Sequence, residues 1–304
     1  MGLFDRAVVA ALPVVPKRVV GRLSSRYIAG AALEDALRVV SGLNAEGKLA
    51  TVDVLGEEVV NEDEAAAIAA EYVAALDAFE RDGLDANVSV KPTGLGLKLD
   101  YGLCKRNVET VIAAAEPTDR FVRIDMEDSS TTDDTLRLVR ELRDEGHGRV
   151  GPVLQASLRR TEADAAGLAG ASVRLCKGIY VEPESIQFRD DQEVRDSFVR
   201  TLETLFDGGC YAAIATHDEW LVDESLRILR ERQLAGDRYE FQMLLGVRPE
   251  LGNRIVAAGH RLRIYVPYGQ QWYEYSLRRL QENPKIAGYV AGDLGRSLLR
   301  GRKP

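Results

Sequence analysis

Polar and charged side chains stand at the carboxyl ends of several short apolar segments of this 304-residue chain. The residues concerned are Lys91, Asp125, Glu127, Gln155, Arg174, Lys177, Thr216, His217 and Tyr265. A single buried polar residue is commonly a satisfied core group, but a buried strand gains little from a charged side chain. Because polar and charged residues recur at the corresponding ends of several predicted strands, they indicate one shared polar site.

A second signal lies in the segment 272–283, where Tyr275, Arg278, Arg279 and Glu282 follow one another at helical spacing. Residues three or four apart share a helix face. Paired guanidinium groups suit a carboxylate or a phosphate, although spacing alone leaves open a solvated charged helix. Together with the strand-end cations, the two arginines favour an anionic ligand.

Other chemistries are less well supported by the residue types. Asp125 and Glu127, two apart on a strand, would face the same side, so spacing leaves open a metal site or a glycosidase pair. The surrounding cations favour an anion over a neutral sugar. The three histidines, His147, His217 and His260, are widely scattered, so we expect no histidine-based metal site.

The elements that must position these residues form a regular alternation. Short apolar runs rich in β-branched and aromatic residues predict eight strands, within residues 49–57, 87–94, 120–128, 151–158, 172–180, 211–219, 239–247 and 260–269. Amphipathic stretches between them predict helices, clearest at 61–83, 131–146 and 192–209, with Asn61 as an N-cap. Eight repeats over this length indicate an α/β fold of the (βα)8 TIM-barrel type. A doubly wound sheet is the competitor, but no strand is followed by G-x-G-x-x-G.

Residues 1–48 predict short helices packed on the barrel, and 49–304 the barrel itself, with a last helix over the carboxyl ends of the strands. The apolar segment 1–20 lacks a basic lead and a cleavage site, so we expect no signal peptide. Packing on the barrel is the simpler interpretation of that segment, and contact with a membrane surface is the alternative.

Bulk composition excludes several classes of protein. The net charge is −8 and no basic stripe stands out, so nucleic acid is not an expected partner. Three widely spaced cysteines, Cys104, Cys176 and Cys210, predict neither a disulfide framework nor a zinc site, and favour a reducing cytoplasm. No apolar run reaches the length that spans a bilayer.

Five segments carry a resemblance to a known family. RFVRIDMED, SVRLCKGIY, IATHDE, YEFQMLLG and RIYVPYGQQWYEYSLRRLQEN resemble, in order, the successive strand motifs of the proline dehydrogenases. The likeness covers roughly residues 49–290 and is greatest to the single-domain bacterial enzymes, since the chain has no room for an aldehyde dehydrogenase domain.

The resemblance implies oxidation of L-proline to 1-pyrroline-5-carboxylate, with hydride transfer to FAD and electrons passed to a membrane quinone. It implies that Asp125 and Arg174 are catalytic, with Arg174 near the flavin N5. The residues implied to bind substrate are Lys91, Tyr180, Leu244, Tyr265, Tyr275, Arg278 and Arg279. Those implied to bind FAD are Met126, Gln155, Arg174, Cys176, Lys177, Gly178, Thr216, His217 and Glu282.

The sequence departs from the bifunctional relatives at Val181, where they often carry tryptophan, and this puts the detail of flavin packing in doubt. Two alternatives to proline oxidation stay open: a flavin oxidase of another cyclic or N-methylated amino acid such as hydroxyproline, and a cofactor-free barrel that binds an anionic metabolite. We expect a cytoplasmic protein. The basic ending SLLRGRKP leaves open a peripheral contact with the inner face of the membrane. The sequence makes no prediction of oligomeric state.

Overall fold

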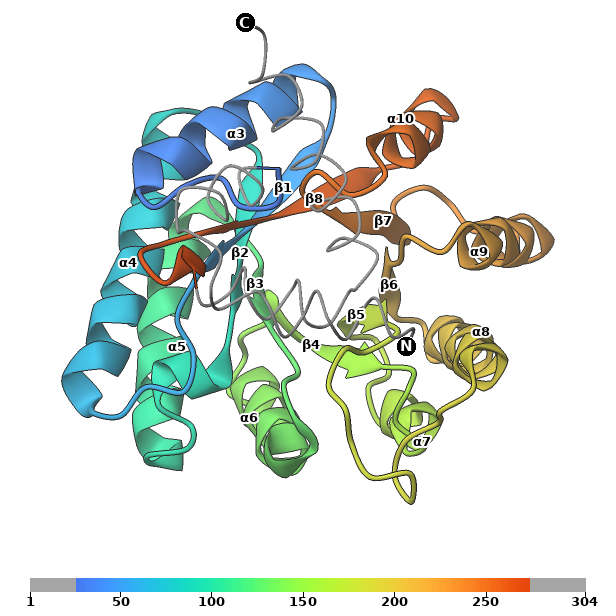
Figure 1. Ribbon diagram of the computed structural model, residues 1–304, viewed down its shortest axis with the longest axis horizontal. Helices are drawn as coiled ribbons and strands as arrows, with labels where there is room; N and C mark the ends of the chain where they lie inside the picture. The colour runs from blue at the N-terminus through green and yellow to red at the C-terminus, as the bar shows by residue number, and fades with distance from the viewer. Residues whose placement is uncertain (1–25, 274–304) are drawn as a thin grey trace, which may run out of the picture.

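A computed structural model describes residues 26–273, and its centre is a closed barrel of eight parallel strands (Figure 1). The strands are β1 (Leu49–Val54), β2 (Ala86–Val90), β3 (Val122–Ile124), β4 (Val150–Gln155), β5 (Ser172–Cys176), β6 (Tyr211–Ala215), β7 (Tyr239–Leu244) and β8 (Leu262–Tyr268). Every predicted run overlaps one of these strands, with β2 and β4 beginning one residue before the predicted run, so the predicted barrel fold is confirmed.

Pairing of the first and last strands closes the barrel. β1 runs parallel to β8 from Leu49 opposite Arg263 to Val54 opposite Tyr268. Each other strand pairs with its neighbours in chain order. Because all strands are parallel, their carboxyl ends meet at one rim, where barrel enzymes carry their chemistry.

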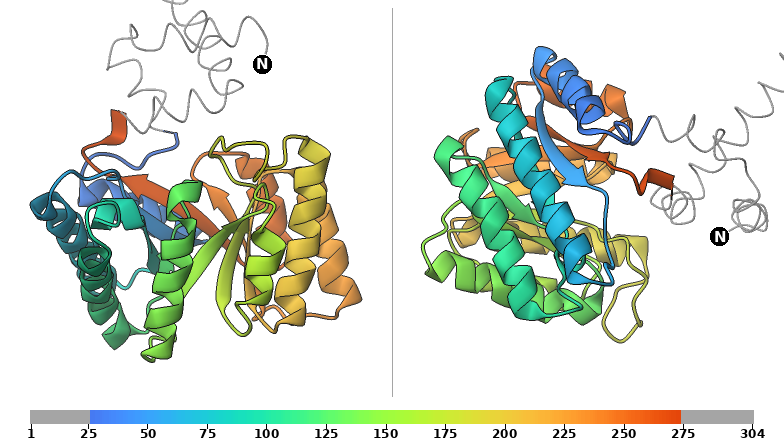
Figure 2. Two further views of the ribbon diagram at one scale, coloured as in Figure 1. Left: turned by 90° about the horizontal axis from the view of Figure 1, so that it is seen from below. Right: turned by 90° about the vertical axis from the view of Figure 1, so that its left-hand side faces the viewer.

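Helices surround the barrel, as the side views in Figure 2 also show. They are α3 (Leu33–Ala45), α4 (Glu62–Arg81), α5 (Tyr101–Ala115), α6 (Thr132–Asp144), α7 (Thr161–Ala166), α8 (Asp191–Asp207), α9 (Glu219–Glu231) and α10 (Pro249–Ala257), with short 3-10 turns η2 (Pro92–Leu95), η3 (Glu116–Thr118) and η4 (Ser129–Thr131). The predicted helices at 61–83, 131–146 and 192–209 are confirmed by α4, α6 and α8. Asn61 caps α4 as predicted, since its Oδ1 accepts from Glu64 N at 2.9 Å.

α3 precedes the first strand and packs against both β1 and β8 on the outside of the barrel (Figure 1). The segments FDRAVVAAL, PKRVVGRLSSRYI and LEDALRVVSGLNAEG carry the helices predicted within residues 1–48, and α3 confirms the third of them. The other two fall wholly or mostly before residue 26, and the predicted helix over the rim falls after residue 273, so these lie outside the described residues. The division into 1–48 and 49–304 stays a prediction.

Side chains alternate along each strand between two environments. On β1, Ala50, Val52 and Val54 belong to the apolar core shared with the helices, while Thr51 and Asp53 are also fully buried. Since successive strand residues point to opposite faces, Thr51 and Asp53 face the barrel interior. The interior of this barrel therefore holds buried polar groups, which need partners there.

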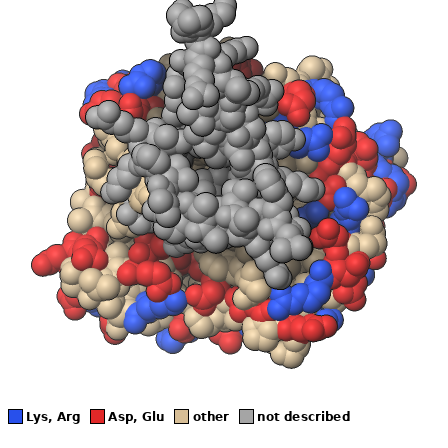
Figure 3. Space-filling view, viewed as in Figure 1, with Lys and Arg blue, Asp and Glu red and all other residues tan. Residues whose placement is uncertain are grey.

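The outer surface carries charges of both signs. On the part of the rim face that is described, Lys and Arg are interspersed with Asp and Glu (Figure 3). Within residues 26–273 no helix is long and apolar enough to cross a membrane.

Candidate active site

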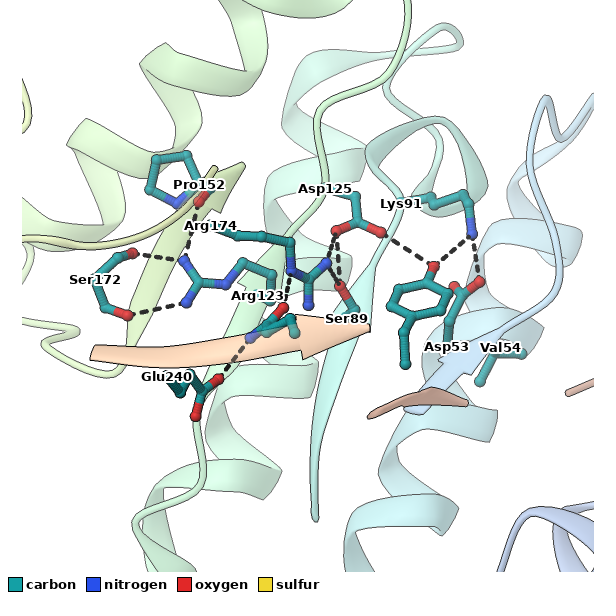
Figure 4. Close-up of polar contacts among 12 residues, drawn as sticks. Asp53, Val54, Ser89, Lys91, Arg123, Asp125, Pro152, Ser172, Arg174 and Glu240 are labelled. Atoms are coloured by element: carbon teal, nitrogen blue, oxygen red, sulfur yellow. Dashed lines mark hydrogen bonds and ion pairs between the residues drawn. The ribbon is translucent and has the colours of Figure 1, made fainter. Parts of the chain in front are cut away.

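An ion pair between Asp125 and Arg174 forms the centre of the polar cluster at the rim (Figure 4). Asp125 follows β3 and Arg174 lies on β5. Arg174 Nη1 donates to Asp125 Oδ1 at 2.7 Å and to Ser89 Oγ at 2.9 Å, and Ser89 Oγ donates to the same Asp125 oxygen at 2.7 Å. The structure thus joins the two residues predicted to be catalytic, with a serine between them that the sequence analysis missed.

Tyr265 of β8 connects this centre to a second ion pair. Its hydroxyl lies 3.3 Å from Asp125 Oδ2 and 3.4 Å from Lys91 Nζ. Lys91 donates to Asp53 Oδ2 at 2.5 Å, and Asp53 is completely buried. The Tyr72 hydroxyl lies 3.1 Å from Asp53 Oδ1. Lys91 and Tyr265 therefore lie together, as predicted. Lys91 is held by Asp53, a residue that the sequence analysis did not predict.

The charges of the site are balanced by these contacts. Asp53 and Asp125 offset Lys91 and Arg174, and Lys177 donates to Asp218 Oδ2 at 2.5 Å. The sequence analysis weighed the cations and overlooked two of the acids. The signal that could have found Asp53 was a charged residue inside the otherwise apolar run LATVDV.

Beneath the rim lies a buried ionic layer that the sequence analysis did not single out. Arg263 Nε donates to Glu240 Oε1 at 2.8 Å, and Arg263 Nη1 donates to Ala50 O at 2.7 Å. Arg123 Nη1 donates to Pro152 O at 3.0 Å and Ser172 O at 2.6 Å. These charged residues have structural partners inside the barrel, so charge in a strand does not by itself identify a ligand site.

The described residues among those predicted to hold FAD lie along the rim from β3 to β6. Met126 is buried beside the end of β3, and Gln155 Nε2 donates to Glu127 O at 2.8 Å. Leu244 N donates to His217 Nε2 at 2.8 Å, and Thr216 Oγ1 accepts from Asp218 N at 3.1 Å. The carboxyl ends of β4, β5 and β6 thus present these groups to the same rim. Cys176 ends β5 and is half-buried.

Asp218 organises part of this rim. Besides Lys177, it accepts from Arg195 Nε at 2.8 Å, and it caps α9 by accepting from Trp220 N. Burial works to raise the pKa of Asp218, but its bonds to Arg195 and Lys177 prevail and lower that pKa to about 2. The position of Lys177 is therefore fixed by an ionised partner.

The substrate-binding predictions divide between described and undescribed residues. Leu244 ends β7, and Tyr180 lies in the loop after β5, where its carbonyl oxygen accepts from Gln187 Nε2 at 2.7 Å. Tyr275, Arg278, Arg279 and Glu282 lie outside the described residues, and their assignments stay predictions.

Glu127 is a buried acid that faces Thr93 with both carboxylate oxygens. Oε2 accepts from Thr93 N at 2.8 Å, and Oε1 accepts from Thr93 Oγ1 at 2.6 Å. Burial raises the pKa of Glu127 to about 7, although the bonds from Thr93 oppose the change. A carboxyl with a raised pKa keeps its proton in the folded chain after the unfolded chain has lost it.

Because Glu127 binds its proton more tightly in the folded chain, we expect the free energy of unfolding to depend on pH. The contribution of Glu127 is fully present below its unfolded pKa and is lost as the pH rises through about 7. Glu127→Gln should remove this dependence, worth at most about 3 kcal/mol between about pH 4.5 and pH 7. Urea denaturation of both proteins across this range measures it. Glu162→Gln, at an exposed acid, is the control, and an unchanged pH curve for Glu127→Gln would contradict the assignment.

A closed parallel barrel with paired charges gathered at its carboxyl rim defines the class of protein: a (βα)8-barrel enzyme. The family model for proline dehydrogenase matches residues 36–291. The chain therefore belongs to the proline dehydrogenase family, which confirms the resemblance found in the sequence.

Curated relatives agree over nearly the whole chain. Proline dehydrogenase 1 of Bacillus subtilis subsp. natto is 35% identical over 267 residues, covering 87% of this chain and 88% of that protein. Proline dehydrogenase of Deinococcus radiodurans is 34% identical over 274 residues, covering 88% of each. With relatives of this coverage, the activity of the chain is that of a proline dehydrogenase.

Solved structures of longer proteins share the fold. Proline utilization A from Bdellovibrio bacteriovorus, inactivated by N-propargylglycine, superposes with a TM-score of 0.83 at 24% identity over 93% of this chain. Proline utilization A from Corynebacterium freiburgense gives a TM-score of 0.74 at 21% identity. This chain covers 36% and 34% of those two proteins, so they support the barrel fold alone.

Proposed function

We propose that this enzyme oxidises L-proline to 1-pyrroline-5-carboxylate, with FAD as the hydride acceptor and a membrane quinone as the final electron acceptor. The observation that carries the proposal is the arrangement around Arg174. This guanidinium is fixed by Asp125 and Ser89, and the Lys91–Tyr265 pair lies beside it. An oriented cation and a second cation within one rim suit a redox site for an amino acid.

The residues at β4 and β5 fit a flavin. Gly178 has φ +98°, and a Cβ there would lie 2.4 Å from Ser157 Oγ and 2.9 Å from Gln155 Oε1. Only glycine allows the backbone after β5 to approach the end of β4 this closely. The approach gathers a backbone segment, the Gln155 amide and Lys177 at one place. Such groups suit the polar edge and the phosphates of FAD.

His217 is held at the end of β6 by a hydrogen bond. Its Nε2 accepts from Leu244 N, which assigns the proton of the neutral ring to Nδ1. The bond also links a residue proposed to contact FAD to one proposed to enclose the proline ring.

When bound, FAD supplies a two-electron acceptor. The protein would bind and orient the substrate, with Lys91 attracting its carboxylate and Tyr265 and Leu244 bordering its ring. The amine must lose its proton before hydride leaves. Arg174 and Lys91 favour that loss, while their partners Asp125 and Asp53 oppose it. Arg174 would also stabilise negative charge that builds up on the acceptor.

For the quinone step, a peripheral membrane contact is part of the proposal. Ile179 and Val181 are exposed on the rim loop after β5, Val181 at 85%. Exposed apolar side chains next to the proposed flavin site would favour an approach to a lipid surface.

An anaerobic titration tests the function. Purified protein, or protein given FAD, should show a flavin absorption band that bleaches on addition of L-proline and returns on addition of a soluble quinone. Hydroxyproline and N-methylated amino acids serve as comparison substrates. A protein that refuses FAD, or a higher kcat/KM for hydroxyproline, would overturn the proposal.

A further inference from the structure

Gln242 of β7 connects the buried ionic layer to the site. Its side chain is 5% exposed and points into the barrel. Gln242 Nε2 donates to Glu240 Oε1 at 2.6 Å, and Gln242 Oε1 accepts from Arg174 Nε at 2.6 Å. The Gln242 amide therefore bonds both to the lower layer and to the guanidinium of Arg174.

The lower end of this connection is rigid. Glu240 accepts from Arg263 through both oxygens, at 2.8 and 3.1 Å, and its Oε2 accepts from the Tyr211 hydroxyl at 3.1 Å. Burial works to raise the pKa of Glu240, but the guanidinium of Arg263 prevails and lowers it. Glu240 is therefore a carboxylate, which can only accept hydrogen bonds.

The chemistry of the two neighbours selects an amide at position 242. Arg174 can only donate, and Glu240 can only accept. The side chain between them must accept at one end and donate at the other. An amide does so without charge, whereas a carboxylate would repel Glu240 and an apolar side chain would leave both neighbours unsatisfied.

The upper end of the connection fixes the plane of Arg174. Gln242 holds Nε, while Asp125 and Ser89 hold Nη1. Bonds on two nitrogens of a planar group leave it little freedom to rotate.

We propose that Gln242 is a positioning residue, which sets the guanidinium plane of Arg174 against the buried Glu240–Arg263 pair. The inference rests on the proposed function, because it gives Arg174 a flavin to act on. Gln242 acts through Arg174 and need not touch substrate or cofactor.

Gln242→Glu distinguishes this role from simple packing. The new carboxyl group would face Arg174 on β5 and Glu240 on its own strand. The other ionisable neighbours of these two groups include Arg263 on β8, Tyr211 on β6, Arg123 on β3 and Asp125 after β3. Two carboxyl groups at hydrogen-bond distance cannot both ionise easily and share one proton. While that proton is present, the variant keeps both hydrogen bonds. When it leaves, repulsion displaces the new side chain.

The experiment measures the rate constant of flavin reduction by proline, in single-turnover mixing, at a series of pH values. At each pH the rate constant of the variant is divided by that of the wild type. For Gln242→Glu we expect the ratio to fall by at least about tenfold between about pH 6 and pH 9, as one hydrogen bond to a charged group is lost. Gln242→Met, which lacks both bonds at every pH, should show a loss that does not depend on pH. Gln192→Glu adds the same charge on the exposed start of α8 and should leave the ratio unchanged.

A second readout does not depend on turnover. Fluorescence titration of the FAD-free protein should show that the Kd for FAD rises with pH in Gln242→Glu, relative to wild type. If Gln242→Met fails to fold, Gln242→Glu at low pH still tests the proposal, because it keeps both bonds.

The possible outcomes distinguish failure of the proposed function from failure of the positioning role of Gln242. A wild-type protein that does not reduce flavin with proline removes the proposed function. An active wild type with a flat Gln242→Glu ratio and an unchanged FAD titration overturns the positioning role alone.

Discussion

Arg174→Met is expected to lower kcat/KM for proline by about a hundredfold to a thousandfold, the usual effect of removing a preorganised charge. Arg174 contacts Asp125, Ser89 and Gln242, and its guanidinium lies 5.5 Å from the centre of the Tyr265 ring. Its loss removes the cation that forms the ion pair with Asp125. Initial rates of proline oxidation at a series of proline concentrations measure the effect.

Arg174→Lys should rescue little of this activity. A lysine has one nitrogen on a flexible chain, so it cannot bond Gln242 and Asp125 at once in the arginine geometry. Arg200→Met, at an exposed arginine of α8 paired with Glu162, is the matched control. Wild-type kcat/KM in Arg174→Met would remove Arg174 from the catalytic assignment.

Asp53→Asn should have the largest effect on stability, about 3–5 kcal/mol, the usual cost of breaking a buried ion pair by removing one partner. Asp53 is fully buried and its carboxylate lies 2.5 Å from Lys91 Nζ. The neutral amide would leave the ammonium of Lys91 buried without its counter-charge. Urea denaturation of the protein without added ligand, at one pH, measures the free energy of unfolding.

A double-mutant cycle isolates the pair. Lys91→Met should destabilise for the converse reason, because it leaves the Asp53 carboxylate buried. The double variant should lose less than the sum of the two single variants, since it leaves no uncompensated charge. Asp82→Asn, in an exposed pair with Arg81, should leave the midpoint unchanged. Additive losses in the cycle would show that the two residues do not stabilise each other.

Local patterns in the sequence were sufficient to predict the barrel. Runs such as NVSVKPTG and YAAIATHDE carry the composition of buried strands, and Asn61 carries the signal of a helix start. The strand signal and the helix-start signal both depend on residues close together in the sequence, because the period of side chains and the capping of a helix involve only a few consecutive positions. The carboxyl ends of parallel strands lie at one rim of a barrel. From this rule alone, one shared site was predicted for Asp125, Arg174, Lys91 and Tyr265.

The partners of those residues were decided only by the tertiary structure. Asp53 and Lys91 are 38 positions apart, and Arg174 and Gln242 are 68 apart. Which inward-facing residues meet depends on the register between strands and on the closure of β1 against β8. Neither the register nor the closure can be read from the period of apolar residues within one strand. For the same reason, the sequence suggested a site of excess positive charge. In the structure, the pairing of β1 with β2 brings Asp53 to Lys91, and Gln242 of β7 connects Arg174 of β5 to the ionic layer beneath.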